Sequence, residues 1–116
     1  MHEDITHPVI SRHIAAVNAF DVDAIVDTFA DDALVYDNRR ELRGKPAIRA
    51  WVAKELVGDR VTMAVTEVIA RGRETVVRAR YDGDFDKTNL PAELILTNYI
   101  TVDDGKIRTL VTVRLS

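Results

Sequence analysis

Two different hydrophobic periods divide the chain, and this division strongly limits the folds that it can adopt. Apolar residues recur at helical spacing through most of residues 9–57, whereas residues 61–115 are rich in Val, Ile, Thr and Leu. Helical patterns followed by a run of strand patterns are typical of an α+β domain. The 116 residues suffice for one hydrophobic core, so we expect a single domain over residues 1–116, with residues 1–7 as a loose tail.

The first half of the chain predicts three helices. Pro8 suits the first turn of one helix, and Asp21 is placed to cap a second helix whose apolar pattern extends to Phe29. Pro46 opens the third helix, and Gly58 is a plausible stop. The helices are expected over residues 9–19, 22–29 and 46–57.

The second half predicts an antiparallel sheet of four strands joined by turn-forming residues. These strands are expected over residues 61–71, 75–81, 93–102 and 107–115, and a short strand over residues 33–38 precedes the third helix. The simplest packing lays the three helices in the concave face of a strongly bent, mainly antiparallel sheet. Such a cone leaves a pocket where the helices fail to fill it.

The composition argues against several kinds of partner. The net charge is -3 and basic residues are scattered, so neither nucleic acid nor an anionic membrane is an expected partner. There is no Cys, the three His show no metal-binding spacing, and no Gly-rich phosphate motif occurs, so we expect no metal and no cofactor. Neither a signal peptide nor a membrane span is visible, which predicts a cytoplasmic protein.

The short strand carries the most suggestive polar residues. Strand alternation places Tyr36 and Asn38 on one face and Asp37 on the other, and the sequence leaves open which face turns inward. Asp37 could be a general base in an apolar pocket or an ordinary turn-forming residue. Tyr36 and Asn38 could hold a water or a substrate oxygen, or be strand-edge residues.

Other candidates lie along the remaining elements. Arg80 and Asp82 share one strand face and form either a solvated ladder or an ion pair beside a substrate. His13 lies at the edge of a helical apolar stripe, as a packing residue or a catalyst. Candidate pocket-wall or substrate-binding residues are Trp51, Thr97, Tyr99 and Thr112.

Both faces of the strand from Glu93 to Val102 contain apolar side chains, so both are expected to be covered. The cavity would cover one face and a second copy of the chain the other, because an apolar sheet face left in water favours aggregation. We therefore expect a homodimer formed through the sheet.

The motifs DxDxIVxxFADDA at residues 21–33 and GxxAIxxW at residues 44–51, in this order of helices and strands, resemble the nuclear transport factor 2-like superfamily. That superfamily includes the SnoaL-like polyketide cyclases. The resemblance covers nearly the whole chain and implies a single SnoaL-like domain, a cystatin-like cone. It also implies an internal pocket for a small apolar molecule, and frequent dimers.

Two enzyme branches of this superfamily supply residue matches. The first half is similar to bacterial ketosteroid isomerases, which places Asp37 on their proton-shuttling Asp. In that comparison His13 and Thr97 stand at the two positions that stabilise the oxyanion in those enzymes.

The limonene-epoxide hydrolases supply the second set of matches. This resemblance places Tyr36 and Asn38 on their water-holding Tyr and Asn, and Arg80 and Asp82 on their Arg-x-Asp pair. Thr112 stands where those enzymes have their remaining catalytic Asp.

Two functions follow as hypotheses. The first is a cofactor-free isomerase, cyclase or hydrolase that acts by proton transfer on a small, largely apolar carbonyl or cyclic molecule. In it, Asp37 moves the proton, Tyr36 or His13 polarises an oxygen, and Arg80 and Asp82 orient it. The alternative is a non-catalytic module that binds a hydrophobic ligand or a protein partner in the same fold.

Overall fold

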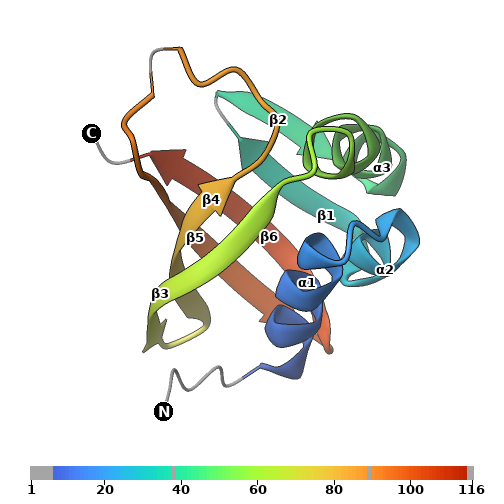
Figure 1. Cartoon of the computed structure of the whole chain (residues 1–116). Coiled ribbons are helices and arrows are strands. Elements are labelled where there is room, and N and C mark those ends of the chain that lie inside the picture. Colours follow the sequence, from blue (N-terminus) through green and yellow to red (C-terminus); the bar gives the residue numbers. More distant parts are fainter. Residues whose placement is uncertain (1–6, 38, 89, 115–116) are drawn as a thin grey trace.

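The computed structural model describes residues 7–37, 39–88 and 90–114, in which three helices lie on one side of a six-stranded sheet (Figure 1). This arrangement confirms the predicted α+β class. The helices are α1 (Pro8–Asn18), α2 (Val22–Asp27) and α3 (Lys45–Trp51), and α3 continues into a π-helix, η1 (Val52–Val57). The strands are β1 (Phe29–Asp37), β2 (Arg40–Arg43), β3 (Thr62–Arg71), β4 (Glu74–Asp82), β5 (Leu94–Asp103) and β6 (Lys106–Arg114).

The sheet has the strand order β2-β1-β6-β5-β4-β3. The pairing of β1 with β6 is parallel, and the other four pairings are antiparallel. This parallel pairing joins the first strand in the sequence to the last one. It sets Asp37 opposite Thr112. Two polar side chains more than seventy positions apart in the sequence therefore share one end of the sheet.

The second helix is shorter than its apolar pattern predicts. It ends at Asp27, and Phe29 begins β1 instead of completing the helical stripe. The backbone N–H of Ile107 donates to the Thr28 carbonyl at 2.8 Å, and Phe29 pairs with Ile107 in the ladder. A strand partner from the far end of the chain thus overrides local helical periodicity, and the Phe29 side chain stays fully buried.

The third helix begins as predicted but ends differently. Gly44 has a φ of +84°, which suits glycine, and Pro46 lies in the first turn. Gly58 keeps right-handed helical angles instead of the left-handed angles of a glycine stop. The Gly58 N–H donates a hydrogen bond to the carbonyl of Ala53, five residues back, at 2.9 Å. A Cβ on residue 58 would overlap the Lys54 carbonyl oxygen. Glycine is therefore needed here for close approach of the backbone.

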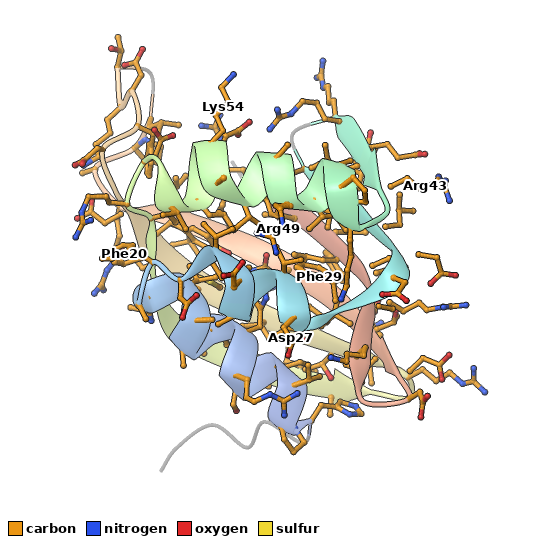
Figure 2. The ribbon with its side chains drawn as sticks, turned by 90° about the vertical axis from the view of Figure 1, so that its right-hand side faces the viewer. Phe20, Asp27, Phe29, Arg43, Arg49 and Lys54 are labelled. Atoms are coloured by element: carbon orange, nitrogen blue, oxygen red, sulfur yellow. The ribbon has the colours of Figure 1, made fainter. Side chains whose placement is uncertain are left out.

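The hydrophobic core lies between the helices and the face of the sheet that they cover. Figure 2 shows Phe29 within the molecule, whereas Arg43 and Lys54 reach its periphery. Asn18 fixes α1 to β3, because its amide donates to the Met63 carbonyl at 3.0 Å and accepts from the Met63 N–H at 2.7 Å. The fully buried apolar side chains include Ile10, Val17, Ile25, Val35, Ile48, Val52, Val77 and Ile107. Among the described helices, none has the length and apolar character needed to cross a membrane.

Candidate functional site

A partly open cavity of about 670 Å³ lies between the helices and the sheet. This volume falls within the range of small-molecule sites, which is roughly 300–1,000 Å³. Apolar side chains form most of its wall, including Val17, Leu56, Val61, Met63, Leu96 and Leu110. Charged side chains of Arg39, Glu55, Asp59 and Arg114 also border it.

Asp37 contributes a carboxylate to this wall. Strand alternation puts it on the same face of β1 as the buried Ala33 and Val35, so the inward-facing member of the short strand is the acid. The indole N–H of Trp51 donates to Asp37 Oδ2 at 3.2 Å, and Arg40 lies 3.4 Å from the same oxygen. Within the described residues Asp37 Oδ1 has no hydrogen-bond partner, which leaves one oxygen available to a ligand.

The π-helix positions the partner that holds Arg40. Glu55 on η1 pairs with Arg40 through contacts of 2.7 and 2.8 Å, much shorter than the contact of Arg40 with Asp37. The hydrogen bond that Arg40 donates to Glu55 is the largest cause of the raised pKa of Arg40. Glu55 is thus the principal ion-pair partner of Arg40, and the contact of Arg40 with Asp37 is the longer one.

The sheet side of the cavity carries a network of neutral polar groups centred on Asn98. The Asn98 amide donates to the Tyr81 hydroxyl at 3.1 Å and to the Val77 carbonyl at 3.2 Å. Its oxygen accepts from the Thr112 hydroxyl at 2.7 Å and from the Tyr81 hydroxyl at 3.3 Å. Burial raises the pKa of Tyr81, and the nearby charge of Asp37 adds to the rise, so Tyr81 is a phenol donor rather than a phenolate.

His13 faces the cavity from α1 and is only 3% exposed. Its Nδ1 lies 3.0 Å from the hydroxyl of Thr28, and its ring packs edge-on against Phe29 with centroids 5.4 Å apart. Burial lowers the pKa of His13 to about 4, so the imidazole is neutral near neutral pH. No set of three His, Asp or Glu side chains in the described ranges is arranged to hold a metal ion.

The structure brings several of the predicted site residues together. Asp37, Trp51, His13 and Thr112 all border the main cavity. Tyr36 also borders it, but it lies on the opposite face of β1 from Asp37 and is 40% exposed. Asn38 lies outside the described residues.

Four predicted residues lie away from the main cavity, which corrects their expected position. Thr97 and Tyr99 occupy the other face of β5, because Leu96 and Asn98 are the inward members of the alternation.

Arg80 and Asp82 flank the inward Tyr81 on β4 and therefore point outward. They pair with Glu93 at 3.6 Å and Lys87 at 2.8 Å, and they border a smaller hollow. The Lys87 contact lowers the pKa of Asp82, as expected of a solvated ion pair.

Sequence reasoning missed Tyr81 and Asn98 as site residues. Tyr81 belongs to the apolar side of its strand, and aromatic residues there are usually core. Asn98 did carry a signal, since it is a lone amide on a strand face otherwise formed by Leu94, Leu96 and Ile100. A buried amide needs hydrogen-bond partners, and here Tyr81, Thr112 and a backbone carbonyl supply them.

A bent sheet that holds three helices on one face and encloses a mostly apolar cavity defines a cone-shaped α+β protein. The chain belongs to the SnoaL-like domain family, whose model matches residues 10–110. This assignment confirms the resemblance noted in the sequence. No match was found among curated proteins.

Solved structures support the same fold. The chain is 28% identical to a proposed polyketide cyclase from Sinorhizobium meliloti, with 90% of this chain and 93% of that chain covered and a TM-score of 0.81. It is 21% identical to the epoxide hydrolase/cyclase-like enzyme SalBIII of pyran ring formation in salinomycin, with coverages of 92% and 88% and a TM-score of 0.80. A protein from Catenulispora acidiphila with a ketosteroid isomerase-like fold is 18% identical, with coverages of 93% and 86% and a TM-score of 0.77.

Proposed function

We propose that this protein is a cofactor-free enzyme that moves a proton on a small, largely apolar carbonyl or cyclic molecule bound in the cavity. One observation carries the proposal. Asp37 borders a mostly apolar cavity and its Oδ1 has no hydrogen-bond partner among the described residues, while Trp51 and Arg40 hold the other oxygen. A positioned carboxylate of this kind can act as a general base.

Tyr81 supplies the complementary group. Removing a proton beside a carbonyl places negative charge on the carbonyl oxygen, and a fixed donor lowers the cost of that charge. The Tyr81 phenol is fixed by Asn98, and the charge of Asp37 is near enough to influence its pKa. A carbonyl compound lying between the two residues would give its α-proton to Asp37 and direct its oxygen to Tyr81. Returning the proton at another carbon isomerises the molecule. Attack of the enolate carbon on a second carbonyl carbon of the same molecule cyclises it, and the resulting alkoxide takes the proton from Asp37.

Exchange of α-protons with solvent tests this proposal with simple carbonyl compounds in place of the natural substrate. The protein is incubated in D₂O with a panel of small cyclic enones and 1,3-diketones, and deuterium uptake at the α-carbons is followed by NMR. We expect exchange at a rate above that of the protein-free sample for the members of the panel that fit the cavity. Equal rates for the whole panel would contradict proton transfer by Asp37.

A specific observation favours a second candidate, a ligand-binding protein without catalysis. Asn98, Thr112 and Tyr81 already satisfy one another, and such neutral groups can orient a bound molecule without reacting. Tight binding of a panel member with no deuterium exchange would support this alternative.

We also propose that residues 1–116 act as one domain that dimerises through the uncovered face of the sheet. Apolar or aromatic side chains occupy one register row across five strands on this face: Tyr36, Val111, Tyr99, Val76 and Ile69. The three helices lie on the opposite side of the sheet (Figure 1). Val76 is already buried within the chain, and a second copy would remove the other four members of the row from water.

Replacing Val111 by Asp should therefore convert a dimer into a monomer. The substitution puts a charge within the apolar row, between Tyr36 and Tyr99, where burial in an interface would be costly. Size-exclusion chromatography with light scattering measures the mass, and circular dichroism verifies folding. Lys54→Asp, on the exposed surface of η1, is the matched control and should remain dimeric. A monomeric wild-type protein at all concentrations would refute the dimer.

A further inference from the structure

The tautomer of His13 follows from a short chain of hydrogen bonds. The hydroxyl of Thr28 lies 2.6 Å from the Ile25 carbonyl oxygen, which can only accept, so Thr28 must donate its single proton there. The Thr28 oxygen must then accept from His13 Nδ1, 3.0 Å away. His13 therefore carries its proton on Nδ1, and Nε2 bears a lone pair.

The lone pair on Nε2 is available to the cavity. No described residue hydrogen-bonds to Nε2, and no polar side-chain atom in the described residues is both fully inaccessible and unpaired. Nε2 must therefore retain accessible surface, and this nearly fully buried residue borders the cavity. A buried acceptor left without a donor weakens binding, so a ligand that supplies one is favoured.

We propose that His13 Nε2 accepts a hydrogen bond from the ligand, so that the cavity selects hydroxylated molecules such as hydroxy ketones, enols and phenols. Thr28 is the positioning residue, because it dictates which nitrogen carries the proton. The inference rests on the proposed function in that it places the ligand in the same cavity. In this proposal His13 takes a different role from the polarisation of a substrate oxygen that the sequence suggested, since Nε2 has no proton to donate.

The polar groups of the cavity then divide into two kinds. Asp37 Oδ1 and His13 Nε2 are acceptors, and the Tyr81 hydroxyl is a donor whose proton a ligand would take over from the Asn98 oxygen, 3.3 Å away. A simple ketone can use the donor but leaves Nε2 unpaired. A molecule that carries both a carbonyl and a hydroxyl group can use both kinds of site.

A two-part experiment tests the assignment. The first part is an NMR experiment on ¹⁵N-histidine-labelled protein near neutral pH. It correlates the ring nitrogens with the protons on the ring carbons, and the nitrogen shifts distinguish a protonated nitrogen from one with a lone pair. The wild-type protein should show Nδ1–H for His13. Thr28→Val, which cannot accept this bond, should lose the single tautomer, whereas Thr28→Ser should keep it.

The second part compares two probes of similar size, 2-naphthol and 2-methoxynaphthalene, by calorimetry. One additional hydrogen bond predicts that 2-naphthol binds about tenfold more tightly and shifts the Nε2 resonance. The preference should fall to within about twofold in Thr28→Val and in His13→Phe, but persist in Thr28→Ser.

An Nε2–H tautomer in the wild-type protein would overturn the proposal. So would equal binding of the two probes, no binding of either, or a 2-naphthol preference that survives His13→Phe. These outcomes are independent of the deuterium-exchange assay. Exchange without hydroxyl preference would leave the proposed function standing and remove the inference, and hydroxyl preference without exchange would do the reverse.

Discussion

Replacing Asp37 by Asn is expected to lower the rate of α-proton exchange by about 10²–10⁴-fold, the usual contribution of a positioned general base. An Asn side chain has the same shape and can still accept the Trp51 N–H, which spans 3.2 Å in the wild-type protein. It lacks a basic oxygen, so the proton has no acceptor. NMR exchange rates at saturating ketone separate this loss from any weakening of binding.

Two further variants make the Asp37 result specific. Asp31 lies on the same strand with its side chain 99% exposed, and Asp31→Asn should leave the exchange rate unchanged. Trp51→Phe removes the donor to Oδ2 along with part of the buried ring, and the lost hydrogen bond should lower the rate by roughly tenfold or less. Undiminished exchange in Asp37→Asn, or an equal loss in Asp31→Asn, would rule out the assigned role.

Acidification from pH 6.5 to pH 4 should remove about 3 kcal/mol from the free energy of unfolding through His13 alone. Burial lowers the pKa of His13 from 6.5 to about 4, so over this range the unfolded chain binds a proton that the folded protein excludes. The contribution is fully present above pH 6.5 and is lost progressively as the pH falls toward 4. Below pH 4 both states are protonated at this residue, and its contribution changes no further.

Urea unfolding at a series of pH values measures this effect. Carboxylates also titrate in the lower part of the range, so the informative quantity is the difference in pH dependence between the wild-type protein and His13→Asn. The variant should be less stable near neutral pH and lose less stability on acidification, by roughly 2–3 kcal/mol. Parallel pH profiles would show that the imidazole is not buried in its neutral form.

The fold was largely predictable because local patterns and global packing agree in most of the chain. The first helix begins at Pro8 and the third begins at Lys45, one residue before the expected Pro46, and the four C-terminal strands fall close to their predicted ranges. The chief local error concerned Phe29, whose helical spacing from Val22 is correct but whose strand pairing with Ile107 prevails. Contacts this distant in sequence leave no trace in a local window.

The site was less predictable because it depends on which strand face turns inward. The sequence showed that Tyr36 and Asp37 point in opposite directions, yet only the packing against the helices makes the acid the inward member. On β5 the same alternation turns Asn98 toward the cavity and places the predicted Thr97 on the other face. Residues on helices avoid this ambiguity, and His13 and Trp51 both reach the cavity as the sequence suggested.

The parallel pairing of β1 with β6 has a consequence for how the protein matures. Asp37 gains its neighbour Thr112, and Asn98 its hydroxyl partner, only when the sixth strand inserts between β1 and β5. During synthesis, a ribosome-bound chain lacking that strand would lack the β1–β6 pairing that brings Asp37 beside Thr112. Closing such long-range pairings is slow relative to helix formation, so acquisition of ligand binding should lag behind the appearance of helical structure during refolding.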